Sequence, residues 1–465
     1  MAPTLNQHET LRHPGAILLV SCYELGHQPL NLASPLAHLR AAGFNPAAVD
    51  TAVDQLDDAL IAAAGLVAIS VPMHTALRLG ALVAERVRRV NPFAHICFYG
   101  LYATLNSSYL LSGPGDSVIS GEYETALVDL ANRLVNGESA STFRESAPRF
   151  DRVQVTQPRR DELPELRRYA GLEREGIIVP AGYVETTRGC HHTCTHCPIT
   201  PIYGGRFFAI NRETVIADAR VQILDGARHI TFGDPDFFNG PTHGLRICRA
   251  LHQEFPDLTF DATIKIEHLI EHRRLVPELS ELGCVFVVTA VESLNPIVLN
   301  HLKKHHTRED VATALAILDD AGIAMRPSLL PFTPWETLDS YLGLLCFIAE
   351  HGLIDHVDPV HFSIRLLIPP GSALLADPTF GEWLGVLDQA HFTYRWTHPD
   401  PRMDALQRAV AHIVEEASSR PEDASATFLS IWNIAHETGG IAPPPIPTPK
   451  RSRPRPPRLT ESWFC

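Results

Sequence analysis

The chain has 465 residues, 45% of them hydrophobic, and a formal net charge of -14. This composition excludes a disordered or fibrous chain and predicts at least two folded domains. The negative charge argues against broad binding to nucleic acids or anionic membranes, because both need a positive surface. Neither a signal peptide nor an apolar run of about 20 residues is found, so we expect a cytoplasmic protein with no membrane partner and a small-molecule substrate.

Short apolar runs alternate with helical patterns over residues 1–137. Strands are expected at residues 16–21, 66–71, 95–100 and 116–122. Strands separated by helices predict an α/β fold with a small doubly wound parallel sheet. Ligands of such sheets bind beyond the carboxyl ends of the strands. His27, Gly100 and Gly121 fall there and are candidate ligand-binding residues.

Residues 138–180 are charged and proline-bearing, which predicts a linker. Six further βα units over residues 181–380 predict a partial (β/α)6 barrel of the TIM type, with its chemistry at the carboxyl ends of the strands. Its strands are expected at residues 182–188, 229–237, 259–266, 284–293, 324–330 and 361–370. A helical extension is expected over 381–440, and the proline-rich, basic residues 441–465 predict an extended, mobile tether.

Cys190, Cys194 and Cys197 form a C-x3-C-x2-C array after the first strand of this second series. Three thiols within eight residues indicate a metal or cluster site. Zinc is the simplest alternative, with a neighbouring histidine as the fourth ligand, but no second Cys/His pair follows at a suitable spacing. A [4Fe-4S] cluster held by three cysteines would leave one iron open to another ligand.

In this setting the array resembles the signature of radical S-adenosylmethionine (SAM) enzymes. The resemblance implies a [4Fe-4S] cluster whose open iron is chelated by SAM. It also implies a reducing flavodoxin or ferredoxin as partner. His196 stands where the family usually has an aromatic residue near the adenine of SAM.

Other positions agree with this resemblance in chain order. Gly233 and Asp234, in FGDPDF, stand where the family contacts the SAM amino group. Glu292 ends the fourth strand, where the family commonly binds the ribose hydroxyls with a carboxylate. A merely solvated carboxylate is the alternative for Glu292.

Two later pairs complete the expected SAM pocket. Lys265 and Arg326, on the third and fifth strands, are candidates to neutralise the SAM carboxylate, with a structural ion pair as the alternative. Pro370 and Gly371, in LLIPPGSAL, resemble the turn that the family places beside the adenine.

The first sheet resembles the cobalamin-binding domain that precedes the barrel in one large class of radical SAM enzymes. Cobalamin is therefore a further candidate cofactor. That class sometimes ligates cobalt through an Asp-x-His-x-x-Gly loop, and the sequence around His27 lacks this motif. We therefore expect any bound cobalamin to lack a lower histidine ligand. A domain that has lost the cofactor, or binds something else, is the alternative.

The end of the chain resembles a smaller group, the CUAEP/CCAEP-tail radical SAM proteins, as do the stretches FGDPDFFNGPTHGLRICRALHQEFPDLTFDATIK and PSLLPFTPWETL. That group has a cysteine followed by selenocysteine or cysteine and then Ala-Glu-Pro. Because this chain stops at Cys465, we expect the gene to continue through a selenocysteine codon. Leu459, Trp463 and Phe464 are expected to dock the tail, with Cys465 taking part in catalysis. A thiol or selenol tail suits a thiophilic metalloid such as arsenic.

The resemblance implies an enzyme that cleaves SAM reductively and transfers a SAM-derived group to a small molecule. That group is either a methyl group carried by cobalamin or the 3-amino-3-carboxypropyl group, which a related tail-bearing group transfers to arsenic. The alternative from another functional class is a non-enzymatic iron-sulfur or cobalamin sensor, or a partner-binding protein.

Overall fold

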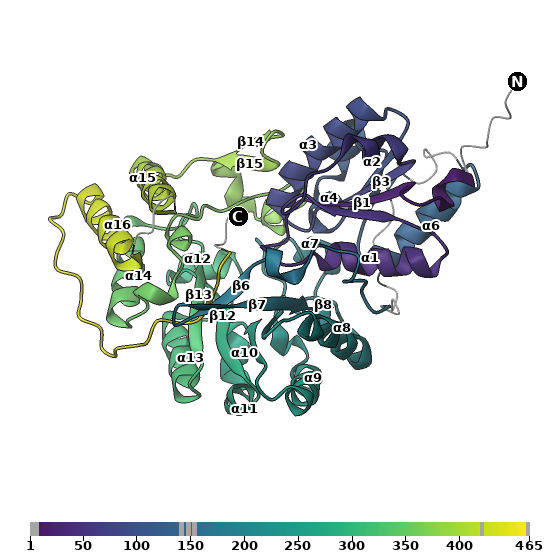
Figure 1. Ribbon diagram of the computed structural model, residues 1–465. Coiled ribbons are helices and arrows are strands. Elements are labelled where there is room, and N and C mark those ends of the chain that lie inside the picture. The colour runs from purple at the N-terminus through teal and green to yellow at the C-terminus, as the bar shows by residue number, and fades with distance from the viewer. Residues whose placement is uncertain (1–8, 139–143, 146–149, 151–155, 419–422, 462–465) are drawn as a thin grey trace, which may run out of the picture.

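The computed structural model describes residues 9–138, 144–145, 150, 156–418 and 423–461. Two sheets dominate it: a five-stranded sheet in the N-terminal part and a seven-stranded sheet in the middle of the chain. They lie beside each other, with the last helices of the chain on the far side of the second sheet (Figure 1).

The first sheet is wholly parallel and has the order β2-β1-β3-β4-β5. Its strands are β1 Ile17–Ser21, β2 Ala47–Asp50, β3 Leu66–Ser70, β4 His95–Tyr99 and β5 Ser117–Ile119. The four expected strands are confirmed. Strand β2 was not predicted, because its four residues AAVD contain no apolar run that marks them as a strand. The helices that connect the strands are α1 Leu30–Ala41, α2 Asp58–Ala63, α3 His74–Val90, α4 Leu101–Leu105, α5 Ser107–Ser112 and α6 Glu124–Val135.

Alternating side chains of β1 face two separate cores. Leu18 and Val20 pack with α3 on one face, and Ile17 and Leu19 pack with α1 and α6 on the other. Side chains of a strand alternate between faces, so a strand buried on both sides is apolar throughout. The sheet is therefore doubly wound, as predicted.

The second sheet curls into half a barrel with the order β13-β12-β11-β10-β7-β6-β16. Its parallel strands are β7 Ile177–Val184, β10 His229–Phe232, β11 Thr259–Thr263, β12 Cys284–Glu292 and β13 Ala324–Leu329. Two antiparallel strands, β6 Gly171–Arg174 and β16 Arg458–Leu459, extend it beyond β7. An antiparallel pair of short strands follows β7: β8 Thr187–Gly189 and β9 Phe207–Ala209, with α7 between them in the chain.

Helices cover the outside of the half-barrel and bury one continuous core. They are α8 Arg212–Leu224, α9 Pro241–Glu254, α10 Ile266–Glu271, α11 Val276–Glu281, α13 Arg308–Asp320 and α14 Leu338–Glu350. Two short helices, α7 Thr200–Tyr203 and α12 Pro296–His301, pack in smaller separate clusters. Capping boxes at Thr307 and Thr337 begin α13 and α14, since each threonine accepts a hydrogen bond from the backbone three residues on. Short 3-10 helices are η1 Glu9–Arg12, η3 Leu166–Arg168, η4 Phe237–Asn239, η5 Ile354–His356, η6 Pro359–Phe362, η7 Ala373–Ala376 and η8 Pro378–Glu382.

Three boundaries differ from the sequence-based expectation. The sixth barrel strand, expected at 361–370, is reduced to a single bridge between Phe332 and Arg365, because η6 and two prolines occupy that stretch. The expected linker contributes β6 and the start of β7 to the barrel sheet. The expected helical extension begins with a hairpin, β14 Leu384–Asp388 and β15 Thr393–Trp396, before α15 Pro401–Ser418 and α16 Ala424–Thr438.

The proline-rich tail lies along the half-barrel instead of hanging free (Figure 1). Lys450 pairs with Glu350, Arg453 pairs with Asp319, and Arg458 pairs with Glu173. The tail then adds β16 to the edge of the sheet. The tail is extended, as expected, but the expected mobile tether is held to the barrel, because its basic side chains meet acidic partners there.

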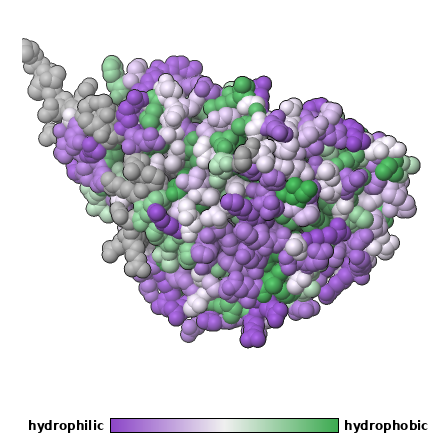
Figure 2. Space-filling model, turned by 180° about the vertical axis from the view of Figure 1, so that it is seen from behind, coloured by the Kyte–Doolittle hydropathy of each residue, from purple (hydrophilic) through white to green (hydrophobic). Residues whose placement is uncertain are grey.

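The surface seen from behind carries hydrophobic residues in small groups among hydrophilic ones (Figure 2). Within the described residues, the helices are all too short or too polar to cross a membrane.

Candidate functional site

The three cysteines of the array lie on the loop between β8 and α7, beyond the carboxyl end of β7. Cys190 and Cys194 are buried, and Cys197 is partly buried. Their sulfurs do not all lie within 4.8 Å of one another. A single tetrahedral zinc ion would need them about 3.8 Å apart, given Zn–S bonds of about 2.3 Å. The arrangement therefore fits a larger metal cluster better than one ion.

Burial, together with the smaller effect of the neighbouring Cys194 and Cys190, raises the pKa of the Cys197 thiol to about 12. The pKa of Cys190 is also raised by burial. Thiolates in such surroundings need a positively charged group to stabilise them, and a bound metal cluster supplies one.

Glu292 lies beside the cysteine loop at the end of β12 and makes two ionic contacts. Its Oε1 is 3.3 Å from His196 Nε2 and 3.2 Å from Lys304 Nζ. Burial raises the pKa of Glu292, but Lys304 and His196 outweigh it and hold the pKa well below its usual range. Glu292 also has a φ of +62°, a left-handed conformation that costs free energy for a residue with a side chain. His196 and Glu292, predicted separately, therefore meet in one charged cluster.

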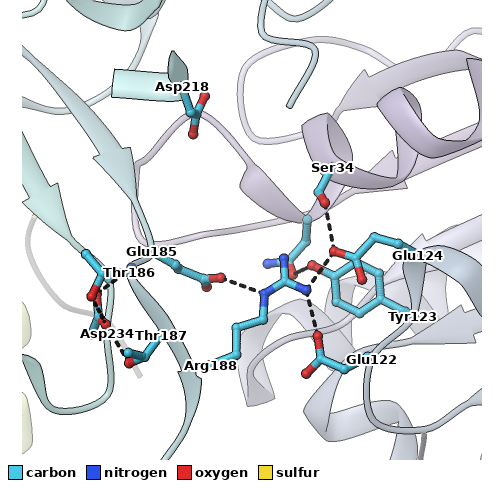
Figure 3. A network of polar contacts seen from close by, with 12 residues as sticks. Ser34, Glu122, Tyr123, Glu124, Glu185, Thr186, Thr187, Arg188, Asp218 and Asp234 are labelled. Carbon is cyan, nitrogen blue, oxygen red and sulfur yellow. Dashed lines mark hydrogen bonds and ion pairs between the residues drawn. The ribbon is translucent and has the colours of Figure 1, made fainter. Parts of the chain in front are cut away.

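Asp234 follows β10 and is buried among threonines. Its carboxylate accepts hydrogen bonds from Thr186 N at 2.9 Å, Thr186 Oγ1 at 2.7 Å and Thr187 Oγ1 at 2.6 Å. The preceding residue is glycine, and a Cβ there would lie 2.0 Å from the Tyr183 hydroxyl, so a larger residue would displace the tyrosine ring. Asp234 thus anchors the chain just before the cysteine loop (Figure 3), a contact that the sequence did not reveal.

Arg326 and Lys265 are both buried but have different surroundings. Arg326 forms an ion pair of 2.7 Å with Asp358 and donates a hydrogen bond of 3.3 Å to the carbonyl of Pro457 in the tail. Lys265 pairs with Glu267 at 3.3 Å. The structural ion pair considered for these residues is thus present at both, and their contact with SAM stays a prediction.

Two cavities, of about 230 and 330 Å³, lie between the first sheet and the half-barrel. Six residues line both: Leu25, His27, Tyr183, Ile199, Gly233 and Pro235. Gly100 and Gly121 line the smaller cavity, at the carboxyl ends of the first sheet. Cys197, Asp234 and Arg326 line the larger one. Some predicted residues of both domains therefore line two cavities that share a wall, whereas His196, Lys265 and Glu292 line neither.

Arg188 joins the two sheets at the edge of the smaller cavity (Figure 3). Its guanidinium lies 2.8 Å from Glu122, 2.7 Å from Glu124 and 3.0 Å from Glu185. Three carboxylates around one buried cation keep the Arg188 pKa high although burial opposes the charge. The role of Arg188 was not predicted, because nothing in the sequence near it indicates that Glu122 and Glu124, some 60 residues earlier, are its partners.

The remaining predicted residues lie apart from these cavities. Pro370 and Gly371 line neither cavity, and Gly371, with φ +76°, approaches Leu105 of α4. Cys465, Trp463 and Phe464 lie outside the described residues. Of the tail, Leu459 and Glu461 line the larger cavity, and Glu461 accepts a hydrogen bond of 2.9 Å from Tyr23.

Residues 184–345 match the family model of the Radical SAM superfamily. This match covers the strands from β8 to β13, the cysteine loop and Glu292, and it bears out the expected superfamily over these residues. The superfamily implies a [4Fe-4S] cluster and SAM as cofactors.

Curated relatives share less than a third of their residues with this chain. An uncharacterized methyltransferase of Pyrococcus horikoshii is 24% identical over 62% of the chain, and a putative methylthiotransferase of Methanocaldococcus jannaschii is 25% identical over 55%. The matches span 64% and 56% of those two proteins. A ribosomal protein uS12 methylthiotransferase, RimO of Trichlorobacter lovleyi, is 25% identical over 36% of the chain.

Solved structures confirm the fold over nearly the whole chain. The radical SAM methyltransferase TsrM from Kitasatospora setae, solved with cobalamin and a [4Fe-4S] cluster, superposes with a TM-score of 0.67 at 14% identity, covering 92% of this chain and 100% of TsrM. The cobalamin-dependent radical SAM enzyme OxsB with aqua-cobalamin gives 0.65 at 14% identity, covering 90% and 72%. The expected α/β architecture of a doubly wound sheet followed by a partial barrel is thus confirmed.

Proposed function

We propose that this chain is a cobalamin-dependent radical SAM methyltransferase that acts on a small molecule. The observation that carries the proposal is the shared cavity region, which receives the carboxyl edges of both sheets and one cysteine of the loop. The names of the relatives, which include methyltransferases and methylthiotransferases, support group transfer from SAM. TsrM was also solved with tryptophan as its substrate, which supports a small molecule here.

Cys190, Cys194 and Cys197 are proposed to hold the [4Fe-4S] cluster, which supplies the electron that cleaves SAM. Glu292 is proposed to bind the ribose, since its carboxylate stays ionised and is held in place by Lys304. Gly233 lines both cavities, and its carbonyl is proposed to accept a hydrogen bond from the SAM amino group.

The smaller cavity is proposed to receive cobalamin, which supplies the carrier for the methyl group. Three lining side chains present buried polar atoms that have no hydrogen-bond partner in the described part of the chain: Glu24 Oε1, His27 Nδ1 and Arg188 Nη2. Orphaned atoms of this kind favour a polar ligand, because leaving them buried and unpaired costs free energy. Burial lowers the pKa of His27 to about 4, so its ring is neutral at neutral pH.

The C-terminal tail, the substrate and the reductant are further parts of this proposal. Resemblance to the CUAEP/CCAEP-tail group supports a catalytic Cys465. A related tail-bearing group transfers the 3-amino-3-carboxypropyl group to arsenic, which supports this transfer as a second candidate chemistry and a thiophilic metalloid such as arsenic as a candidate substrate. The docked path of residues 450–461 supports a tail that reaches the larger cavity. A flavodoxin or ferredoxin is the proposed reductant.

One experiment distinguishes these chemistries. The full-length protein is reconstituted anaerobically with iron, sulfide and hydroxocobalamin, reduced, and incubated with SAM. We expect S-adenosylhomocysteine and 5'-deoxyadenosine as products. Detection of methylthioadenosine would instead indicate aminocarboxypropyl transfer and contradict methyl transfer. A protein that binds the cluster but makes none of these products would be a sensor.

Cys194→Ala is expected to abolish all products. Cys346→Ala is the matched control, since Cys346 lies on α14, remote in the chain from the loop. Equal loss in both variants would contradict the assigned role of the cysteine loop.

A further inference from the structure

Three side chains from separate strand-end segments converge beside the cysteine loop without belonging to the array. His192 stands on the loop itself, Asp236 precedes η4, and His268 lies on α10. His268 Nδ1 is 2.8 Å from Asp236 Oδ2, and His192 Nε2 is 3.3 Å from the same oxygen. All three ligand-type atoms lie within 4.8 Å of one another.

These converging atoms are buried and have only one another as polar partners. Asp236 is fully buried, and the side chains of His192 and His268 are each 10% exposed. Among the described residues, no other group forms a hydrogen bond with His192 Nε2, Asp236 Oδ2 or His268 Nδ1. The contacts of 3.3 and 2.8 Å converge on one oxygen, Asp236 Oδ2. A cation between the three atoms would neutralise the buried carboxylate and bind a lone pair of each imidazole.

The spacing is close to that in the ligand shell of one metal ion, and the two imidazole nitrogens lie within 4.8 Å of each other. Zn–N and Zn–O bonds of about 2.0 to 2.2 Å place tetrahedral ligands about 3.3 to 3.6 Å apart. The two observed separations, 2.8 and 3.3 Å, reach this range with small outward movements of the side chains. By contrast, the cysteine sulfurs are too far apart for one ion.

Neighbouring groups fix the orientation of Asp236 and His192, as they commonly do around a metal site. The other carboxylate oxygen of Asp236 accepts a hydrogen bond of 3.1 Å from Phe238 N, which fixes the carboxylate. The second nitrogen of His192 lies 3.8 Å from Glu267 Oε2, and Glu267 pairs with Lys265. Histidine ligands of metals characteristically have a carboxylate or carbonyl beside their second nitrogen.

We propose that His192, Asp236 and His268 bind one divalent zinc-type ion. Two imidazoles and one carboxylate suit zinc, iron(II) or cobalt(II), whereas calcium and magnesium prefer oxygen ligands and copper(I) prefers sulfur. Zinc fits best, because it binds this ligand set without geometric preference and takes water in its fourth position. The ion ties the cluster-bearing loop to the ends of β10 and β11, and so holds the loop in position.

A second arrangement shares His268. His268, Glu271 and His272 also come within 4.8 Å of one another, but Glu271 is exposed. This set supplies a matched control, since His272 is a histidine one helical turn from His268 that the proposed site does not use.

The test measures zinc in the full-length protein after the [4Fe-4S] cluster has been reconstituted. Protein freed of loosely bound metal is equilibrated with buffered zinc chloride, and zinc, iron and acid-labile sulfide are counted per chain. We expect about one tightly bound zinc per chain, lost in His268→Gln and kept in His272→Gln, with cluster content unchanged in both. Asp236→Asn should also lose zinc, while its side-chain oxygen can still cap η4. It replaces His268→Gln as the test if that variant does not fold.

Three results would overturn the proposal. The protein could bind no stoichiometric zinc, His268→Gln and Asp236→Asn could both retain it, or His272→Gln could lose it while Asp236→Asn does not. Because the readout is zinc content, the test is independent of whether the protein transfers a methyl group.

Discussion

Lys304 Nζ lies 3.2 Å from Glu292 Oε1, and both groups are buried at the end of β12. Burial lowers the pKa of Lys304, but Glu292 more than compensates and raises it, and the cluster cysteines add to this effect. The two residues are 12 apart in sequence, and their contact joins the turn after α12 to the end of β12. The carboxylate proposed to bind SAM is therefore kept ionised by a lysine that is itself fully enclosed.

Lys304→Met should leave a buried carboxylate without its main counter-charge. Breaking a buried ion pair from one side costs about 3–5 kcal/mol of unfolding free energy. We expect a matching loss of stability in chemical denaturation and weaker SAM binding by calorimetry. Lys303→Met, at the exposed neighbour, should change neither. If Lys304→Met and Lys303→Met changed stability and SAM binding equally, the Lys304–Glu292 ion pair would not be the cause.

Arg188→Gln should weaken the connection between the two sheets. The substitution leaves Glu122, Glu124 and Glu185 close together without a cation, and their repulsion in a buried site costs several kcal/mol. We expect a lower unfolding temperature and a lower cobalamin content after reconstitution, read from absorbance. Arg206→Gln, at a nearby exposed arginine, is the control. Unchanged stability and cobalamin content in Arg188→Gln would contradict the bridging role.

The stability of the apo protein should fall as pH rises from 6 to 8. Burial, and then the charge of Asp50, raise the pKa of Glu24 to about 8. The unfolded state therefore loses this proton at a lower pH than the folded state. Between the two pKa values each pH unit removes about 1.4 kcal/mol of stability.

Glu24→Gln should flatten this decline by about 2–3 kcal/mol between pH 6 and 8, because glutamine does not titrate. Denaturant unfolding at both pH values measures the difference. Glu85→Gln, at an exposed glutamate of α3, should leave the slope unchanged. A slope in Glu24→Gln as steep as in the unmodified protein would exclude Glu24 as its source.

The tail should become accessible to protease when its ion pairs are removed. Arg453 pairs with Asp319 and holds the tail beside α13. We expect Arg453→Gln to speed tryptic cleavage after Arg451 and Arg458 several-fold, since an exposed, extended strand is the form that proteases bind. Position 453 is itself a poor tryptic site because proline follows it. Arg408→Gln, on the exposed face of α15, should leave the cleavage rate unchanged. Rapid cleavage of the unmodified protein would contradict the docked path.

Much of the fold was predictable because its signals are local. Apolar runs of five or six residues separated by amphipathic helices are enough to predict doubly wound and barrel sheets. The prediction failed where tertiary contacts decide: β2 is too short to stand out, and the stretch at 361–370 contains strand-like residues that η6 and prolines divert from the sheet. The tail was predicted as an extended, mobile tether from its proline-rich, basic composition, which does not reveal that Glu350 and Asp319 pair with Lys450 and Arg453.

The sequence by itself determined the cysteine array, the order of the two domains and the placement of Glu292 at a strand end, because spacing and periodicity are properties of the chain. Only the tertiary structure decided which side chains meet. It pairs Glu292 with Lys304, closes three glutamates around Arg188, and brings His192, Asp236 and His268 together. These contacts join residues whose separation in sequence carries no periodic signal. They form because the carboxyl ends of parallel strands converge on one edge, where buried charges must find partners.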